Sequence, residues 1–143
     1  MENVVVDYFK GRGAQINTDN RYLKNRYVQE HTEGLDEEFL LKEKTEIIYT
    51  YPKTIINKVE NTEIGLGYSI NPYQGCEHGC VYCYARNTHE YWGYSAGLDF
   101  ERKIIVKKNC IEVLEKNFCN KKWKPSPIML SGNTDCYQPV ERE

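Results

Sequence analysis

The sequence lacks the features that would assign it to a membrane, to the secretory pathway or to a strongly charged partner. It has no run of 18 consecutive apolar residues, and its first residues, MENVVVDYFKGRG, contain too short an apolar run for a signal peptide. Lysine and arginine (19) nearly balance aspartate and glutamate (21), which gives a formal net charge of −2. This balance excludes a bulk positive field, although it is compatible with a local basic groove. We therefore expect a cytoplasmic protein that does not act at membranes.

Internal repeats and low-complexity tracts are also absent from the sequence. The 143 residues are enough for one ordinary domain with a hydrophobic core. They are few for a complete β/α barrel, which takes about 250 residues. The fold is therefore expected to be small or to be part of a larger one.

Residues 1–64 are interpreted as an N-terminal extension. Most of this segment is polar, contains turn signals and predicts a short helix at 36–44. Toward its end, β-branched and aromatic residues predict short strands, which are interrupted at Pro52 and Asn61. The extension is thus expected to be mostly irregular and rich in strands.

Residues 65–143 follow the order strand, loop, helix, strand. Lys103–Lys107 predicts a short strand, and apolar residues at helical spacing over 111–118 predict a helix. Ile128–Leu130 predicts a buried parallel strand that ends in a polar turn. This alternation of strands and helices predicts the α/β class.

The most informative segment is NPYQGCEHGCVYCYAR, which places Cys76, Cys80 and Cys83 within eight residues. Six cysteines without a secretory signal and with such uneven spacing do not suit a disulfide framework. In a reducing compartment a tight cysteine cluster more often binds a metal. Cys110 and Cys119, by contrast, are expected to be small buried apolar residues.

Two metal sites fit this cluster. Three thiolates spaced C-x3-C-x2-C on one loop can hold three irons of a cubane iron–sulfur cluster and leave the fourth iron open. An open metal position is where a substrate or cofactor binds. The alternative is a Cys3His zinc knuckle in which His78 or His89 supplies the fourth ligand.

The pattern C-x3-C-x-aromatic-C, formed by Cys76, Cys80, Tyr82 and Cys83, resembles that of radical S-adenosylmethionine enzymes. The surrounding SINPYQGCEHGCVYCYAR is similar to the branch that contains spore photoproduct lyase and the "DNA repair photolyase"-like proteins. Three further blocks resemble the same branch: KGRGAQINTDNRY, THEYWGYSAGLDFERKI and WKPSPIMLSGNTDCYQPVERE. The resemblance implies that residues 65–143 are the start of a partial (β/α) barrel, with its first two strands.

The resemblance also implies the cofactors. Cys76, Cys80 and Cys83 would ligate a [4Fe-4S] cluster, and S-adenosyl-L-methionine would bind the open iron with Tyr82 near its adenine. The expected activity is the formation of a 5′-deoxyadenosyl radical, with electrons from a donor of the flavodoxin or ferredoxin type. The substrate is unknown, and the lyase relative suggests nucleic acid by analogy. A chain with only the first two barrel strands is expected to bind the cluster poorly and to be inactive alone.

Related enzymes hold the methionine amino group with a Gly-Gly-Glu motif at the end of the second strand. The corresponding residues here are Gly132, Asn133, Thr134 and Asp135, which depart from that motif but offer suitable oxygen acceptors. A plain turn that closes the strand explains them equally well. Cys136 stands where the branch has proline, and it is either a hydrogen-atom donor, by analogy with the lyase, or an ordinary thiol.

Other residues near the cysteines have both a functional and a plain interpretation. Glu77 and His78 lie in the cysteine loop, where a hydrogen bond to a sulfur would tune a reduction potential, or they could simply be solvated. Arg86 and His89 could face a phosphate or the cofactor carboxylate, but salt bridges on the loop surface are the expected arrangement. Four aromatic residues are expected to pack over the cluster and exclude solvent rather than to stack on bases: Tyr84, Tyr91, Trp92 and Tyr94.

Two classes of function therefore remain after the sequence alone. The first is a radical S-adenosylmethionine enzyme. The second is a zinc-knuckle module that binds RNA without catalysis. The metal that the protein binds discriminates between them.

Overall fold

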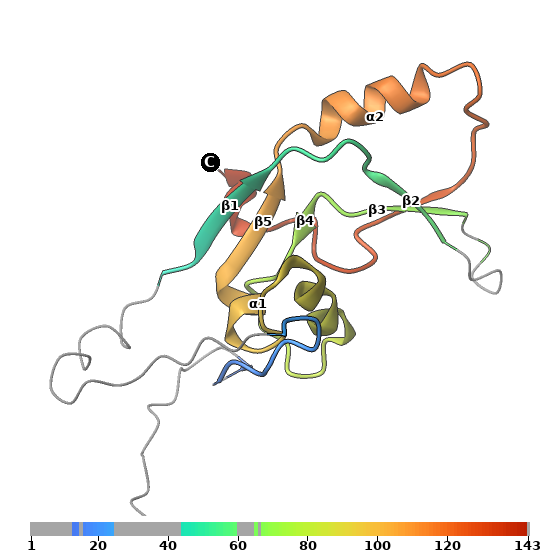
Figure 1. The fold of residues 1–143 in the computed structure, drawn as a ribbon. Helices are drawn as coiled ribbons and strands as arrows, with labels where there is room; N and C mark the ends of the chain where they lie inside the picture. The colour runs from blue at the N-terminus through green and yellow to red at the C-terminus, as the bar shows by residue number, and fades with distance from the viewer. Residues whose placement is uncertain (1–12, 15, 25–43, 60–64, 66, 143) are drawn as a thin grey trace, which may run out of the picture.

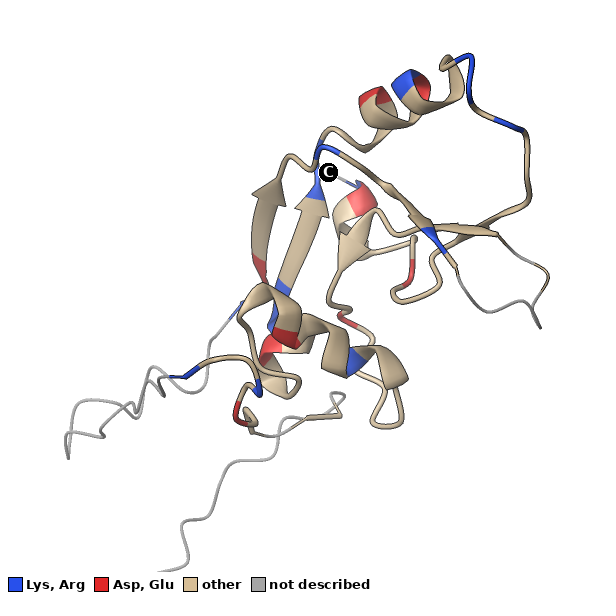
Figure 2. Cartoon of the chain, turned by 45° about the vertical axis from the view of Figure 1, so that its right-hand side comes forward, with Lys and Arg blue, Asp and Glu red and all other residues tan. Residues whose placement is uncertain are grey.

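The computed structural model describes five segments of the chain, residues 13–14, 16–24, 44–59, 65 and 67–142 (Figure 1). The helix predicted at 36–44 and the strand break predicted at Asn61 lie outside these residues, apart from Lys44. Basic and acidic positions are interspersed along the described ribbon (Figure 2). None of the described helices combines the length and apolar content that a membrane span needs.

Six strands, two α-helices and two 3-10 helices form the described fold. Their order is β1 (Glu46–Thr50), β2 (Ile56–Lys58), β3 (Tyr68–Ile70), β4 (Tyr73–Gln74), η2 (Tyr84–Trp92), α1 (Leu98–Arg102), β5 (Lys103–Lys107), α2 (Cys110–Phe118), β6 (Ile128–Leu130) and η3 (Pro139–Arg142).

The first sheet has the order β1-β5-β4, with β5 in the centre. β1 runs parallel to β5, from the pair Glu46 and Lys103 onward, and β4 runs antiparallel to it. Ile104 and Ile105 of β5 are fully buried, as expected for a central strand of β-branched residues. The strand predicted at Lys103–Lys107 is confirmed.

The second sheet has the order β2-β3-β6, with β3 in the centre. β6 is parallel to β3, whereas β2 is antiparallel to it. A small core of Ile55, Ile70 and Val113 joins this sheet to α2. The parallel strand predicted at Ile128–Leu130 is therefore present. It is not buried as predicted, and Leu130 is 59% exposed. The reason is that, among the described strands, β6 pairs with a neighbour on one side only.

Helix α2 confirms the predicted helix, but its buried face differs from the predicted one. Ile111 is 73% exposed and Phe118 is 46% exposed, whereas Val113 is buried against the second sheet. Cys110 is partly buried beside this core, as predicted, but Cys119 is exposed because it follows the last turn of α2. The register of an apolar helix face depends on where the partner sheet lies, which periodicity alone does not give.

The predicted α/β class is thus confirmed as a small mixed α/β domain with two three-stranded sheets. A partial barrel is not shown by the described residues. In Figure 1 the two sheets lie side by side, and the segment between β4 and β5 forms a separate lobe at one end of the first sheet.

Candidate functional site

The cysteine loop, residues 75–83, follows β4 and owes its shape to two glycines. Gly75 and Gly79 have φ angles of 84° and 62°, in the left-handed region that favours glycine. A Cβ atom on Gly75 would lie 2.7 Å from the carbonyl oxygen of Lys103, so the loop also passes too close to β5 for a side chain. The glycines therefore fix the path of the chain around Cys76.

The three motif cysteines are free thiols of intermediate exposure. The backbone turns twice within the loop, since Gly79 N donates to Cys76 O (3.4 Å) and Cys83 N donates to Cys80 O (3.3 Å). Within the described segments, no three Cys, His, Asp or Glu side chains are close enough together to hold a metal ion. The predicted ligand set thus shares one loop, and its role as a ligand set stays a prediction.

Arg86 holds the backbone of the cysteine loop by hydrogen bonds. Its guanidinium donates two hydrogen bonds to the carbonyl oxygen of Cys80, at 3.0 and 2.9 Å, and forms an ion pair with Glu101 at 2.5 Å. The Glu101 side chain is completely buried, and that of Arg86 is 13% exposed. The surface salt bridge predicted for Arg86 is therefore wrong: the pair is buried, because Glu101 lies on α1 beneath the cysteine loop.

An N-terminal strap, residues 13–14 and 16–24, crosses the same lobe. Ala14 N donates to Glu101 Oε1 (2.7 Å), and Thr18 N donates to Ser95 Oγ (2.7 Å). Farther along, the Asn20 amide donates to two backbone carbonyls and Arg21 pairs with Glu90 at 2.6 Å. The strap thus completes the polar contacts of the cysteine-loop lobe.

Close backbone packing explains why glycine is needed at position 13 of the strap and at position 97 of the segment that the strap contacts. A Cβ on Gly13 would lie 2.1 Å from the carbonyl oxygen of Gly79, and one on Gly97 would lie 2.1 Å from that of Ile16. No real Cβ atom tolerates such an approach. This N-terminal segment was expected to be irregular, and its packing against the cysteine-loop lobe was not predicted. Gly13 and Gly97 could have indicated it, because a glycine often marks a close approach of two backbone segments.

The loop after β6, residues 131–138, lies against the cysteine loop and against the residues that precede it, Asn71 and Tyr73. Asn133 N donates to Asn71 Oδ1 (2.9 Å), Thr134 Oγ1 donates to Tyr73 O (2.9 Å), and the Tyr84 hydroxyl donates to the carbonyl of Gly132. The reason is the parallel pairing of β3 and β6, whose carboxyl ends meet at one edge of the sheet. The structure therefore brings together the two groups of residues that the sequence singled out.

The individual residues of the 131–138 loop differ in what they can offer. Thr134 is 4% exposed and its hydroxyl is occupied by Tyr73, so it holds the loop in place. Asp135 Oδ1 accepts from Tyr137 N (2.8 Å) in a turn, and its Oδ2 faces His78. Cys136 is a free, partly buried thiol. Asp135 is thus the best-placed acceptor in the loop.

His78 lies between the two loops. Its Nδ1 is 3.4 Å from the sulfur of Cys76, and its Nε2 is 3.5 Å from Asp135 Oδ2. A second contact joins the same loops, since Glu77 N donates to Gln138 Oε1 (3.4 Å). The plain interpretation of His78 as a solvated residue fits its exposure, since 53% of its side chain is exposed, and both ring nitrogens also have a polar neighbour.

The aromatic residues around the loop do not cover it as predicted. Tyr82 is 90% exposed, Tyr84 73%, Tyr91 72% and Trp92 41%. Tyr91 instead stacks on Tyr22 of the strap, with ring centroids 4.8 Å apart. The short turns of η2 direct Tyr84, Tyr91 and Trp92 outward, and periodicity did not indicate a 3-10 helix there.

His89 is buried in the lobe below the loop, and not on its surface as predicted. Its ring centroid lies 5.3 Å from that of Tyr94 and 5.6 Å from that of Phe100. Burial lowers the pKa of His89 to about 4, an effect that Asp99 opposes and Lys103 reinforces. His89 is therefore neutral in the folded protein at neutral pH.

We expect the folded chain to lose stability as the pH falls from 7 to 5. The unfolded imidazole, with a pKa of about 6.5, binds a proton in this range, whereas His89 in the folded state does not until about pH 4. The free energy of unfolding should therefore fall by about 2 kcal/mol over these two pH units. Urea titrations at pH 7 and pH 5 would measure the change.

The His89→Phe variant is the control for this loss. It keeps an aromatic ring among Tyr94 and Phe100 but cannot bind a proton. Its stability should depend on pH much less than that of the original chain. Equal pH dependence in the two chains would show that another group is responsible.

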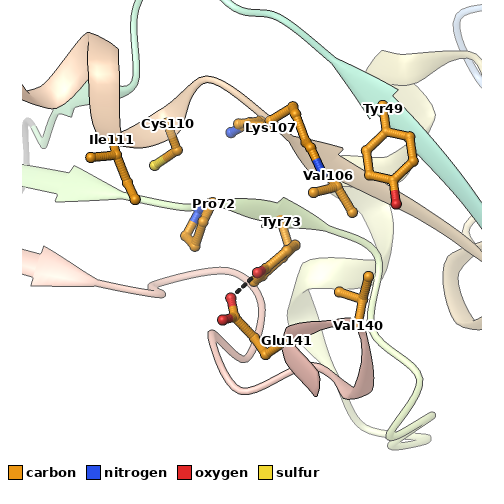
Figure 3. Close-up of a pocket in the computed structure, with 10 residues that line it drawn as sticks. Tyr49, Pro72, Tyr73, Val106, Lys107, Cys110, Ile111, Val140 and Glu141 are labelled. Atoms are coloured by element: carbon orange, nitrogen blue, oxygen red, sulfur yellow. Dashed lines mark hydrogen bonds between the residues drawn. The ribbon is translucent and has the colours of Figure 1, made fainter. Parts of the chain in front are cut away.

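A separate cavity of about 610 Å³ lies on the other side of β4, between β5, α2 and η3 (Figure 3). Burial lowers the pKa of Lys107 and raises that of Cys110, both of which line it. Lys107 Nζ donates to Asn71 O (2.6 Å), and the Asn71 side chain accepts from Asn133. Lys107, which lines the cavity, thus contacts the 131–138 loop through Asn71.

Comparison with known proteins finds relatives of unknown function. An uncharacterized protein of Mycobacterium tuberculosis is 40% identical over 90 residues, which are 62% of this chain and 26% of that protein. One from Methanocaldococcus jannaschii is 30% identical over 103 residues (72% of this chain, 36% of that protein), and one from Acidianus two-tailed virus is 29% identical over 90 (57% and 30%). No family model matches the chain, and no solved structure matches it significantly. The chain spans about a quarter to a third of the length of these relatives.

Proposed function

We propose that this chain is part of a radical S-adenosylmethionine enzyme, similar to spore photoproduct lyase and the "DNA repair photolyase"-like proteins. The observation that supports it best is the position of the cysteine loop directly beside the 131–138 loop, at the carboxyl ends of the parallel strands β3 and β6. In α/β folds this edge is where ligands bind. We further propose that β3 and β6 are the first two strands of a larger β/α barrel.

The donor chemistry fits a [4Fe-4S] cluster held by Cys76, Cys80 and Cys83. All three are free thiols that solvent reaches in part, and the glycines and Arg86 fix the backbone between them. Soft thiolates are the ligands that iron–sulfur clusters require. Binding requires the three side chains to turn toward one another, because they do not yet form a metal-binding group in the described residues.

When bound, the cluster would supply the electron that cleaves S-adenosyl-L-methionine and yields the 5′-deoxyadenosyl radical. The chain itself would orient the cofactor. The carboxylate of Asp135 would accept from its amino group, assisted by the Gly132 and Asn133 backbone, and the exposed Tyr82 would lie near the adenine. Thr134 holds the loop in position from within.

Electrons would come from a flavodoxin or a ferredoxin, because clusters of this class are reduced at low potential. Nucleic acid is the substrate class that the lyase resemblance suggests. For Cys136 we propose no more than a thiol close to the cofactor loop, and the hydrogen-atom transfer inferred from the lyase would need its own test.

The metal content tests the proposed function. We expect the chain, prepared without oxygen and supplied with iron and sulfide, to turn brown and to bind iron and sulfide in equal amounts, at low occupancy because it has only the first two strands of the proposed barrel. S-adenosyl-L-methionine and dithionite should then give 5′-deoxyadenosine only slowly and without turnover of a substrate. A colourless chain that takes up stoichiometric zinc and no cluster would contradict the proposal.

That second result would instead support a zinc-knuckle module that binds RNA. One observation favours it, namely the 3.4 Å contact of His78 with the sulfur of Cys76, which places a fourth ligand type beside the cysteines. His89 does not serve this purpose, because its ring is enclosed by Tyr94 and Phe100.

A further inference from the structure

We propose that the cavity between β4, β5, α2 and η3 binds a small anion with an apolar body, in chemical terms an apolar carboxylate (Figure 3). None of the residues that line this cavity belongs to the cysteine loop, and the inference does not depend on the function proposed above. It starts from two lining side chains, the amine of Lys107, which has no countercharge, and the apolar side chain of Ile111, which is left uncovered.

Lys107 brings a positive charge to the cavity wall without a carboxylate to neutralise it. Its Nζ donates to the backbone oxygen of Asn71 at 2.6 Å, and within the described segments the amine has no other hydrogen bond and no ion pair. An ammonium group has three N–H donors, so two remain for a ligand. Burial lowers the pKa of Lys107, which means that its charge is poorly solvated. A carboxylate bound beside the amine would offset this cost.

Most of the remaining wall is apolar. It is formed by Pro72, Tyr73, Val106 and Val140, of which Tyr73 is only 7% exposed. Ile111 of α2 also lines the cavity, and it is 73% exposed. An apolar body in the cavity would remove part of this Ile111 surface from water. The volume of about 610 Å³ is in the range in which small-molecule sites are found.

The charges of the lining favour a ligand with a single negative charge. Lys108 and Glu141 also line the cavity, and both are exposed. Together with Lys107 they give the lining a formal charge of +1, since two cations stand against one carboxylate. Glu141 accepts from the Tyr73 hydroxyl and would oppose a second negative charge. A carboxylate therefore suits the cavity better than a phosphate dianion does.

Isothermal titration calorimetry with 2-naphthoate tests the site, and 2-naphthamide serves as a neutral probe of the same shape. We expect the carboxylate to bind the original chain about tenfold more tightly than the amide, because it gains a charge-assisted hydrogen bond from Lys107. Lys107→Met should abolish this difference. Lys116→Met makes the same change at an exposed position of α2 and should preserve it. Equal affinity of the original chain for the two probes would overturn the proposal.

A second pair of variants leaves Lys107 in place and alters only the exposed position 111, so it tests the proposal even if Lys107→Met fails to fold. Ile111→Glu adds a negative charge beside the cavity, whereas Ile111→Gln has a similar size and no charge. Both should weaken the binding of 2-naphthamide to a similar extent. Ile111→Glu should weaken the binding of 2-naphthoate severalfold more than Ile111→Gln does. An equal loss of 2-naphthoate affinity in the two variants would contradict an anion site.

Nuclear magnetic resonance locates the bound probe. In the chain with ¹³C-labelled isoleucine methyl groups, the ring current of 2-naphthoate should shift the Ile111 resonance. The Ile16 resonance, from an exposed residue of the strap, should not move. An Ile111 resonance that stays unchanged at saturating 2-naphthoate would place the probe elsewhere and overturn the proposal.

A second copy of the chain is the other occupant to be tested. Sedimentation velocity measures whether the original chain is a monomer under the conditions of the titrations, which is the expected result. A dimer that Ile111→Gln dissociates and that excludes 2-naphthoate would assign this face to a subunit interface instead, against the proposal.

Discussion

Replacing any one of Cys76, Cys80 or Cys83 by alanine is expected to abolish binding of the iron–sulfur cluster. In the proposed function the protein would supply three ligands to a cluster whose fourth iron is left for the cofactor, so no ligand could be spared. Iron and sulfide per chain, and the absorbance of the cluster, would be measured after anaerobic reconstitution of each variant beside the original chain.

Cys110→Ala and Cys119→Ala are the matched controls, since they make the same chemical change on α2 and just after it. Both should keep the iron content of the original chain. Loss of iron in Cys110→Ala as complete as in Cys80→Ala would show that the ligand set is wrong. Variants that fold poorly would be recognised by their circular dichroism before iron is added.

Arg86→Met is expected to lower the free energy of unfolding by about 3–5 kcal/mol, because it leaves the completely buried Glu101 carboxylate without its cationic partner. The same change removes both guanidinium hydrogen bonds to the Cys80 carbonyl. Chemical denaturation would measure the loss. The cysteine loop should also become more open to alkylation of Cys80, which mass spectrometry would detect.

Two further variants isolate the buried pair. Arg86→Met with Glu101→Leu should be less destabilised than the sum of the single changes, since it removes the buried carboxylate together with the Arg86 guanidinium. Lys122→Met replaces an exposed cation by the same residue and should change stability by less than about 0.5 kcal/mol. Additive single changes would mean that Arg86 and Glu101 do not act as a pair.

Local sequence patterns predicted those parts of the molecule that depend on near neighbours. β5 and α2 were expected from β-branched residues and apolar spacing, and both are present. The parallel strand β6 was expected from a short apolar run before a polar turn. Its position beside β3 then explains why the two groups of candidate residues meet.

The features that the sequence did not predict depend on contacts between distant segments. Glu101 and His89 look like ordinary surface residues in the sequence, but both are buried. Glu101 is held by Ala14 of the strap and by Arg86, and His89 packs between Tyr94 and Phe100. Tyr84 was expected to pack over the cysteine loop and is exposed instead, because the 3-10 turns that direct it outward leave no periodic signal. Burial of a polar side chain is decided by its partners, which local patterns do not contain.

The hydrogen bond from Ala14 to Glu101 joins residues 87 positions apart in the chain. During synthesis the strap therefore emerges long before its partner on α1, and such distant closures are made late in folding because they carry a large loss of chain entropy. Until that closure, the buried Arg86 and Glu101 pair lacks the hydrogen bond from Ala14. The proposed cluster would therefore meet the final form of its loop only after this lobe is complete.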